Sequence, residues 1–369
     1  MKSHLKIGLY SPYLPKHFGG GEKYLLDVAR CLVADGHQVV IGLTELDRPI
    51  AKIQKEYEVF LGESLDGIRW EQAPVGPDST WWKKLLWTKQ FDVFYHLTDG
   101  SLWWSLAGRS ILHIQFPFTD KPAGIIHRLK LWRWPIKNAN SLFTKKIVEK
   151  SWQTKIPYVH HPMVAVPTDV QAHPIKKEKI ILSVGRFFTH LHSKRQDVLV
   201  ELFRQLRQQY PTELKGWKLV LIGQIEDAAY AQRVAQMAAG MPVELYHQAS
   251  KAEVWQWYQK AQIYWHAAGY EIDELKEPLK VEHFGISTVE AMSVGAVPVV
   301  LGKGGQPEVL GSELKQYLWS TVSEAIEITA RLIKNSTEWQ NASRAAQARS
   351  LTFGKDVFQK ILRTMIGAT

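Results

Sequence analysis

The sequence contains a single cysteine, Cys31, in 369 residues. One thiol cannot form an internal disulfide or build a cysteine metal site, so disulfide-stapled domains and cysteine-based zinc modules are excluded. Long apolar runs are missing as well. No stretch approaches the ~20 residues that cross a bilayer, and residues 1–11 carry no cleavage signature. These absences predict a protein that stays in the reducing cytoplasm.

Low-complexity segments are also absent, and hydrophobic residues make up 45% and charged residues 22% of the chain. This composition predicts a globular, ordered protein. A chain of 369 residues is too long for one ordinary core, so we expect about two domains with a cleft between them. The net charge of +10 fits nucleic acid, an anionic membrane surface or anionic small molecules as partners, and does not choose among them.

The beginning of the chain predicts a parallel strand–helix–strand unit. An apolar strand over 5–10 leads through a glycine-containing loop into an amphipathic helix over 22–35, and an apolar strand follows over 38–43. Cys31 lies on the apolar face of that helix. Two further short apolar strands are predicted at 92–96 and 110–114.

A second alternating series begins after a Pro- and Val-rich segment over 157–174, which we interpret as an interdomain linker. Its predicted strands and helices alternate along the chain, with strands at 180–184, 217–222, 263–266 and 297–301 and helices at 196–210, 252–260 and 287–294. The fold class is therefore α/β. In such sheets ligands bind at the carboxyl ends of the strands, so candidate site residues should follow the strands.

A glycine turn opens directly into a predicted helix near Gly285. The first amides of a helix have no intrahelical partner, so those of Gly285, Ile286 and Ser287 are predicted to cradle a diphosphate. Glu282 before the turn and Glu290 within the helix can accept hydrogen bonds from a sugar and a ribose. An ordinary helix start with two surface glutamates remains the alternative.

Two other segments carry candidate residues. Arg186 follows a strand that ends in glycine, and Lys194 precedes a helix, so both are predicted to neutralise a departing diphosphate. Solvated basic residues are the alternative. Gly20 and Gly21 lie in a glycine loop that permits close approach of a ligand, although no Gly-Lys-Ser follows, so it is not a Walker loop. A plain flexible turn explains these glycines equally well.

Taken together, Gly-Gly-Gly-Glu in the first loop, Gly-Arg with a following lysine, and two glutamates before Ala-Met resemble the retaining glycosyltransferases of family 4. The resemblance covers nearly the whole chain. It implies the GT-B architecture, with two Rossmann-like doubly wound domains and an interdomain cleft. The domains are expected at 1–168 for the acceptor and 169–350 for the nucleotide sugar, with a helix in 351–369 crossing back to the first domain.

The resemblance also implies residue roles. Arg186 and Lys194 are expected to bind the diphosphate, Glu282 the donor sugar, and Glu290 the ribose. Gly20 and Gly21 are expected to approach the donor, and His113 matches the family histidine near the reacting sugar carbon, although a neutral core histidine is the alternative there. The family uses no metal, and the sequence has no Asp-x-Asp element. Residues 270–280 read as an inserted loop before Glu282.

We therefore expect a hexosyltransferase that uses a nucleotide-diphosphate sugar as donor, either GDP-mannose or a UDP-hexose, and no metal or other cofactor. The acceptor is expected to be a glycan or a lipid-linked molecule. A nucleotide-sugar epimerase or a hydrolase on the same fold is the alternative. A nucleic-acid-binding protein is the less favoured one, because no nucleic-acid motif is present.

Tryptophan and basic residues are interleaved in the first half of the chain, which holds nine of the fifteen tryptophans. Residues 121–155 contain nine Lys and Arg against one acid, Glu149. Such a segment suits the headgroups of an anionic bilayer, so we expect peripheral association with the cytoplasmic face of a membrane. Tryptophans packed in the core with solvated cations are the alternative.

Overall fold

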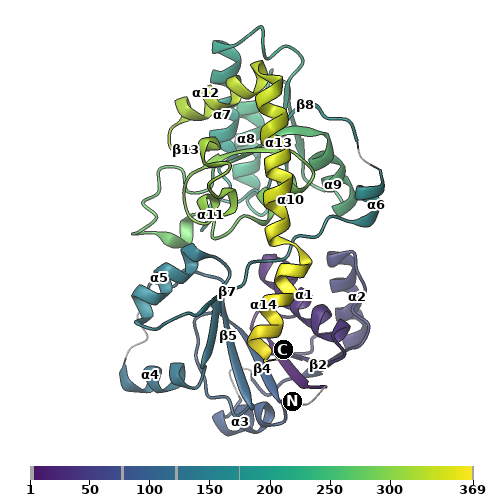
Figure 1. Ribbon diagram of the computed structural model, residues 1–369, viewed down its shortest axis with the longest axis vertical. Helices are drawn as coiled ribbons and strands as arrows, with labels where there is room; N and C mark the ends of the chain where they lie inside the picture. Colours follow the sequence, from purple (N-terminus) through teal and green to yellow (C-terminus); the bar gives the residue numbers. More distant parts are fainter. Residues whose placement is uncertain (1–3, 76–78, 121–123, 174, 368–369) are drawn as a thin grey trace. The chain divides into compact units, whose positions relative to one another are not determined.

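The computed structural model describes residues 4–75, 79–120, 124–173 and 175–367. The chain divides into two compact units (Figure 1). Unit 1 comprises residues 1–163 and 355–369, and unit 2 comprises residues 164–354. The sequence placed these boundaries after residues 168 and 350.

Unit 1 is built on a parallel sheet of seven strands in the order β3-β2-β1-β4-β5-β6-β7. The predicted strands over 5–10, 38–43, 92–96 and 110–114 are confirmed as β1, β2, β4 and β5. The strands are β1 Lys6–Tyr10, β2 Gln38–Leu43, β3 Ile68–Gln72, β4 Val93–Thr98, β5 Arg109–Ile114, β6 Ile136–Ala139 and β7 Tyr158–Val159.

The helices of unit 1 are α1 Gly20–Ala34, α2 Ile50–Leu61, α3 Trp81–Lys89, α4 Gly124–Trp132, α5 Leu142–Trp152 and α14 Lys355–Ile366. Helix α1 begins two residues before the predicted start. The Glu22 carboxylate accepts a hydrogen bond from the Gly19 amide at 2.9 Å, which caps the helix at Gly19 and accounts for the earlier start. Cys31 is buried on this helix, as predicted.

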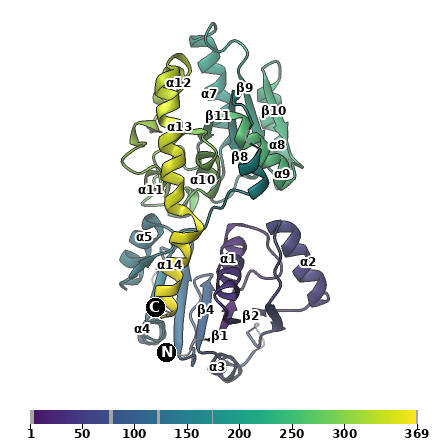
Figure 2. The same cartoon turned by 45° about the vertical axis from the view of Figure 1, so that its right-hand side comes forward.

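Helix α14 follows unit 2 in sequence but belongs to unit 1 (Figures 1 and 2). Phe358, Leu362, Met365 and Ile366 are buried in the same hydrophobic cluster as the strands of unit 1. Its backbone is also held by a side chain, because His160 Nε2 lies 3.0 Å from the Phe358 carbonyl oxygen. The C-terminal helix is thus part of the core of unit 1.

Unit 2 contains a parallel sheet of six strands in the order β10-β9-β8-β11-β12-β13. The predicted second α/β series is confirmed, including all four of its strands. The strands are β8 Glu178–Val184, β9 Lys218–Ile222, β10 Val243–Tyr246, β11 Ala261–His266, β12 Val297–Leu301 and β13 Leu318–Trp319.

The helices of unit 2 include the predicted ones over 196–210, 252–260 and 287–294, observed as α7, α9 and α10. The full set of helices in unit 2 is α6 Thr168–Ala172, α7 Gln196–Gln209, α8 Ala228–Ala238, α9 Lys251–Lys260, α10 Ile286–Ser293, α11 Gln306–Leu310, α12 Val322–Lys334 and α13 Ser336–Ser350. The 3-10 turns are η1 Pro278–Lys280, η2 Lys315–Tyr317 and η3 Leu351–Phe353.

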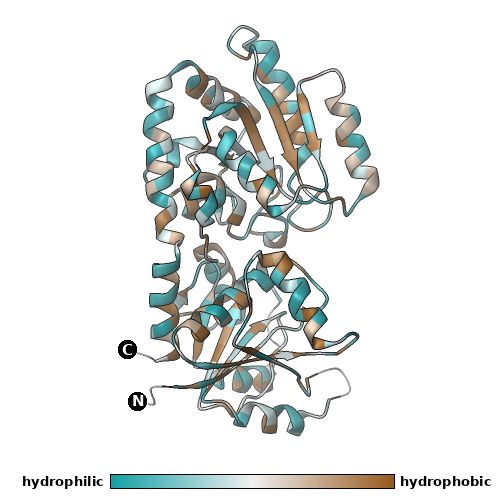
Figure 3. Ribbon diagram, turned by 90° about the vertical axis from the view of Figure 1, so that its right-hand side faces the viewer, coloured by the Kyte–Doolittle hydropathy of each residue, from teal (hydrophilic) through white to brown (hydrophobic). Residues whose placement is uncertain are grey.

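The strands of both sheets are hydrophobic, and the helices combine polar and apolar residues (Figure 3). Central strands such as β12 are buried along their whole length, as expected for parallel sheets covered by helices on both faces. None of the helices in the described ranges has both the length and the apolar composition of a membrane span.

Candidate functional site

The strand order of unit 2 changes direction between β8 and β11, which are neighbours in the sheet. At such a point the connections after the two strands diverge and leave a crevice at the carboxyl edge, where ligands bind in doubly wound sheets. Residues 185–195 follow β8, and residues 267–285 follow β11. The predicted residues Arg186, Lys194 and Glu282 all lie in these two connections.

The turn after β8 requires glycine for close packing. A Cβ atom on Gly223 would lie 1.9 Å from the Gly185 carbonyl oxygen, and one on Gly185 would lie 2.5 Å from Cγ of Lys194. Gln196 Nε2 holds the turn by donating to the carbonyl oxygens of Gly185 and Arg186 at 2.9 and 3.1 Å. The turn therefore fixes where Arg186 and Lys194 leave the backbone.

The Glu282 carboxylate is the electrostatic centre of this region. Its Oε2 forms an ion pair with Lys194 Nζ and accepts a hydrogen bond from His266 Nε2 at 2.9 Å. Burial by itself would raise the pKa of Glu282, but the Lys194 charge and the His266 hydrogen bond hold it well below its ordinary value. Glu282 is therefore an anion fixed at the edge of the sheet.

His266, at the end of β11, fixes the Glu282 carboxylate in place. Burial lowers the pKa of His266, so the ring is neutral and its single proton is placed on Nε2, which faces Glu282. Within the described residues Nδ1 has no hydrogen-bond partner. His266 was not among the residues predicted from the sequence. The sequence feature that could have indicated His266 is a polar residue at the carboxyl end of a buried strand.

Arg186 is one of the residues that line a cavity of about 530 Å³. The others are Phe188, His190, Leu191, His192, Glu226, Asp227 and Ala228. Its guanidinium pairs with Glu226 at 2.7 Å and lies over the Phe188 ring. Both charged side chains are half exposed, so this pair is weak and can be exchanged for another anion.

His192, which also lines this cavity, was not singled out by sequence analysis. Burial and then the nearby Lys194 charge lower the pKa of His192 to about 3. The ring is therefore neutral at physiological pH. His192 is thus a neutral polar group close to Lys194 and Arg186, the two cations that were predicted to bind a diphosphate.

Helix α10 begins at a glycine in the left-handed region, because Gly285 has φ of 114°. A Cβ atom there would lie 2.7 Å from Gln306 Nε2, so the position favours glycine for two reasons. Ser287 in the first turn accepts a hydrogen bond from the Tyr264 hydroxyl at 2.8 Å. The amides of Ile286 and Ser287 are those that a helix leaves without intrahelical partners.

Two glycines pack closely against the backbone carbonyl group of Glu282. The Gly305 amide donates to the Glu282 carbonyl oxygen at 2.8 Å, and a Cβ atom on Gly304 would lie 2.1 Å from that oxygen. Residues 270–280 form the expected loop, which ends in η1. Arg195 anchors this loop by donating to the Tyr270 carbonyl oxygen at 3.0 Å.

Glu290 lies on α10 and accepts a hydrogen bond from the Tyr258 hydroxyl at 2.9 Å. Burial and the Glu290 charge raise the pKa of Tyr258 well above its ordinary value, so this hydroxyl stays protonated and donates. Tyr258 was also not singled out by sequence analysis. It lies on a predicted helix distant in sequence, so spacing gave no signal.

In unit 1, Gly20 and Gly21 form the first turn of α1. A Cβ atom on Gly21 would lie 2.2 Å from Gln115 Nε2, beyond the end of β5. The glycine run therefore allows α1 to pack closely against the connection after β5. These residues lie at the carboxyl edge of the first sheet.

His113 is fully buried on β5. Its ring stacks on Tyr24 with 3.8 Å between centroids, and Nδ1 is hydrogen-bonded to Asn138 Oδ1. Burial lowers the pKa of His113 to about 3, so the ring is neutral and its proton is assigned to Nδ1. Nε2 then carries a lone pair without a partner among the described residues.

Comparison with known proteins gives the family. The sequence profile described as "Glycosyl transferases group 1" matches residues 166–349, which is nearly all of unit 2. The chain is a group 1 glycosyltransferase. The sequence left open an epimerase, a hydrolase and a nucleic-acid-binding protein as alternatives, and the family that matches is one of transferases. No curated protein sequence matches the chain.

Solved structures resemble the glycosyltransferase over both units. HepE of Anabaena, solved with UDP and glucose, is 16% identical with a TM-score of 0.66, covering 98% of this chain and 99% of its own. A glycosyltransferase of Rickettsia africae is 15% identical with a TM-score of 0.72 and 99% coverage of both chains. Sucrose-phosphate synthase of Thermosynechococcus elongatus is 14% identical with a TM-score of 0.67, covering 99% of this chain and all of its own. The glycosyltransferase thus has the GT-B fold.

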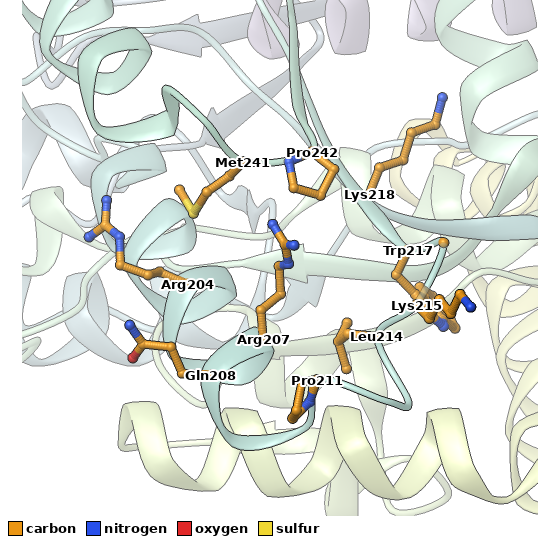
Figure 4. A pocket seen from close by; sticks show the side chains of 11 residues that line it. Arg204, Arg207, Gln208, Pro211, Leu214, Lys215, Trp217, Lys218, Met241 and Pro242 are labelled. Carbon is orange, nitrogen blue, oxygen red and sulfur yellow. The ribbon is translucent and has the colours of Figure 1, made fainter.

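A second cavity of the glycosyltransferase, of about 710 Å³, lies at the amino ends of β9 and β10, and Figure 4 shows the residues that line it. Gly185, by contrast, follows the carboxyl end of β8. Arg204, Arg207, Lys215 and Lys218 line the second cavity. Two of these cations form ion pairs with residues that do not line the cavity, since Lys218 pairs with Glu244 and Arg204 with Glu201. It is separate from the Glu282 region. In the described part of the chain, no cluster of three His, Cys, Asp or Glu side chains is arranged to hold a metal.

Proposed function

We propose that this glycosyltransferase transfers a hexose from a nucleotide-diphosphate sugar, GDP-mannose or a UDP-hexose, to a glycan or lipid-linked acceptor with retention of configuration. The observation that carries the proposal is the Glu282 carboxylate fixed by Lys194 and His266 at the switch point of the second sheet. The Glu282 anion can accept hydrogen bonds from sugar hydroxyls, and the neighbouring Lys194 cation and the helix start after Gly285 can bind negative charge. The region therefore matches a sugar diphosphate, which presents hydroxyls and negative charge together.

Glu282 is proposed to bind the donor sugar. Both protein contacts of the carboxylate use Oε2, and none of the described residues donates a hydrogen bond to Oε1. That oxygen can accept hydrogen bonds from sugar hydroxyls. Because Lys194 and His266 hold the carboxylate rigidly, little freedom is lost when the sugar binds.

Arg186 and Lys194 are proposed to bind the diphosphate, together with the amides of Ile286 and Ser287 at the helix start after Gly285. The diphosphate carries more charge than the Glu226 carboxylate, so it competes for the half-exposed Arg186. As the bond between the sugar carbon and the diphosphate oxygen breaks, negative charge grows on the diphosphate. The acceptor hydroxyl oxygen then bonds to the sugar carbon on the same face, and its proton passes to an oxygen of the leaving diphosphate, so catalysis is chiefly electrostatic.

Glu290 is proposed to accept a hydrogen bond from the ribose, with the Tyr258 hydroxyl fixing its orientation. In unit 1, Gly20, Gly21 and His113 are proposed as substrate contacts, with the unpartnered Nε2 of His113 as a hydrogen-bond acceptor. We propose further that the reaction needs no metal and that the protein works at the cytoplasmic face of a membrane as a peripheral protein.

The donor is tested by thermal stability of the purified protein against UDP, GDP, ADP and their hexose conjugates, because a ligand that binds only the folded state raises the melting point. A selective rise for uridine or guanosine nucleotides is expected. Glu290→Ala should abolish it, and Glu244→Ala is the matched control, since Glu244 accepts from Tyr246 in a similar pair away from the site. Equal stabilisation by all nucleotides, or none by any, contradicts the proposal.

Retention and metal independence are tested on the product. The anomeric configuration of the new linkage, read by NMR, should equal that of the donor, and an inverted product would refute the retaining mechanism. Turnover should survive dialysis against EDTA. Loss of turnover that Mg²⁺ or Mn²⁺ restores would show that a metal takes part.

A further inference from the structure

Helix α4 of unit 1 presents its apolar side chains to solvent. Ile125, Ile126, Leu129 and Trp132 have exposed fractions between 47% and 74%, whereas Leu131 is the buried member of the helix. The spacing of Ile125, Leu129 and Trp132 by four and three residues places them on one side of the helix. This is the reverse of an ordinary surface helix, whose apolar stripe faces the core.

Helix α3 has the same property. Trp81, Trp82 and Leu86 are exposed, with fractions between 47% and 69%. Trp87 anchors the helix instead, because it is buried and its indole nitrogen donates to Glu71 at 2.8 Å. The exposure of α3 is therefore a feature of a helix fixed to the sheet, and not of a detached segment.

The two helices border one continuous surface. The loop between β4 and β5 joins them, since the Leu106 amide donates to Thr88 of α3 at 3.0 Å and Arg133 after α4 donates to the Ser105 carbonyl oxygen at 2.9 Å. Leu106 itself is exposed. Burial and then the charge of Lys130 on α4 lower the pKa of Lys84 on α3, so the two ammonium groups are near each other. Both helices lie at the lower edge of unit 1 in Figures 1 and 2.

The charge on this surface has one sign. Residues 81–89 and 124–133 contain no aspartate or glutamate. Their basic side chains are Lys83, Lys84, Lys89, Arg128, Lys130 and Arg133. Lys83 lies 5.7 Å from the Trp82 ring, so cations and aromatic rings are interleaved and not segregated. We call the exposed residues of both helices, with Leu106 and Arg133, the α3–α4 face.

We propose that the α3–α4 face docks this glycosyltransferase on the surface of an anionic lipid bilayer, with tryptophan and isoleucine side chains among the headgroups and the cations paired with lipid phosphates. This inference deepens the proposed function and rests on it for the acceptor. Tryptophan and basic residues together are typical of helices that lie in the headgroup region. The cores of protein–protein interfaces are depleted in lysine, which favours a bilayer over a protein partner.

Docking through this face would confine the protein to the same membrane surface as a lipid-linked acceptor. A lipid-linked acceptor stays in the bilayer, so a protein held on the same surface meets it at a high effective concentration. Because the helices are short and lie along the protein surface, the attachment is reversible. Salt should weaken it, since its electrostatic part acts within a Debye length of about 10 Å at 0.1 M.

The test is co-sedimentation of the full chain with vesicles of phosphatidylglycerol and phosphatidylcholine, against vesicles of phosphatidylcholine alone, at low salt. The wild type should bind the anionic vesicles. Replacing both Ile125 and Trp132 by serine should reduce binding at least tenfold. Val59→Ser is the matched control, because Val59 is 72% exposed on α2 of the same unit. Equal binding to both vesicle types, or equal losses in variant and control, would overturn the proposal.

Charge is tested separately. Lys83→Gln should lower binding to anionic vesicles about fivefold, the effect of one basic residue near such a surface. Lys55→Gln on α2 should leave it unchanged. Self-association of the wild type at the same low salt, measured by sedimentation velocity and lost in the Ile125→Ser, Trp132→Ser variant, would show that a second copy covers the face and would overturn the proposal.

The same variants separate the two proposals. None of the substituted residues belongs to the Glu282 region, so the nucleotide-dependent rise in melting point should persist in every docking variant. Vesicle binding without any nucleotide effect would overturn the proposed donor site and support the docking face. A nucleotide effect without vesicle binding would do the reverse.

Discussion

The two units have sheets of the same kind but bury different polar groups. In unit 1, the hydroxyls of Tyr24 and Tyr95 lie 2.6 Å apart, and Tyr24 also contacts His160 at 2.5 Å. These groups and Asn138 are neutral and buried. In unit 2, the polar groups at the carboxyl edge include the ion pair of Lys194 and Glu282, whose side chains are 14% and 12% exposed.

Under the proposed function, this difference distinguishes a network that mainly holds the core of unit 1 from the donor site of unit 2. Neutral hydrogen-bonded groups satisfy one another and hold the core in one arrangement. A buried ion pair is costly, because both charges lose their water, and it contributes little net stability. Under the proposed function, a ligand that needs these charges accounts for the ion pair at the switch point of unit 2. Four substitutions test this distinction.

The largest effect is expected for Lys194→Ala. Turnover should fall by about 10² to 10³, because charge stabilisation of the leaving diphosphate is lost where it matters most. The fold should persist, and Arg186→Ala should act similarly. Lys218→Ala is the control, since Lys218 also pairs with a glutamate, Glu244, at 3.0 Å. Steady-state kinetics measure both, and near-normal turnover of Lys194→Ala would remove Lys194 from the site.

The loss of stability caused by a Gly→Ala substitution should also differ between the two units, because the turn after β8 in unit 2 is closely packed. Gly223→Ala places a Cβ atom 1.9 Å from a backbone oxygen, so the turn must shift, at a cost of about 3 kcal/mol in the free energy of unfolding. Gly8→Ala in unit 1 meets the Phe91 ring at 2.6 Å, which is a side chain and can move. Its cost should be smaller. Urea unfolding compares them, and the reverse order would contradict the role assigned to the turn.

The buried histidines of unit 1 predict a pH dependence of stability. Burial lowers the pKa of His113 and His160 to about 3 and that of His96 to about 4. Below pH 6.5 the unfolded chain binds protons that the folded unit does not, so stability falls with decreasing pH. Each histidine contributes about 1.4 kcal/mol per pH unit in this window.

His113→Gln should therefore reduce the slope of unfolding free energy against pH by about 1.4 kcal/mol per unit between roughly pH 5.5 and 4.5. Hydrogen exchange of the β4 and β5 amides reports on unit 1 directly, and the variant at pH 7.5 supplies its own baseline. An unchanged slope would mean that His113 is already protonated in the folded unit.

The smallest effect is expected for Tyr95→Phe. The substitution removes one hydroxyl from the network and should lower the unfolding free energy by about 1 to 2 kcal/mol, with turnover unchanged. Tyr246→Phe, at a partly exposed hydroxyl, is the control and should change stability by less than about 0.5 kcal/mol. A large loss of turnover in Tyr95→Phe would show that the network of unit 1 acts in catalysis.

The sequence predicted those parts of the fold that local pattern determines. The apolar runs of β2 and β12 were located to the residue, because each follows a glycine turn and is buried along nearly all its length. Strand β3 was missed, since Ile-Arg-Trp-Glu-Gln mixes charges into a short run. The two-residue strands β7 and β13 carry no periodicity at all.

The site shows the same limit. Glu282 and Lys194 were singled out as candidates because glycine turns mark the connections that carry them. Their ion pair, and the hydrogen bond from His266, join residues 88 and 16 positions apart through the sheet, so spacing could not reveal them. The outward apolar stripe of α4 was equally hidden, because the sequence shows that a stripe exists but not which side of the helix the core covers.

The place of α14 has a consequence for synthesis. Unit 1 begins with residue 1 but receives its last helix only after the whole of unit 2 has been made. At 5–20 residues per second this delay lasts roughly 10 to 40 seconds. During that time the positions of Phe358, Leu362 and Met365 in the cluster are unfilled. Unit 2 can therefore complete its core first, although it is second in the chain, and a chaperone that binds nascent apolar surface should prefer unit 1.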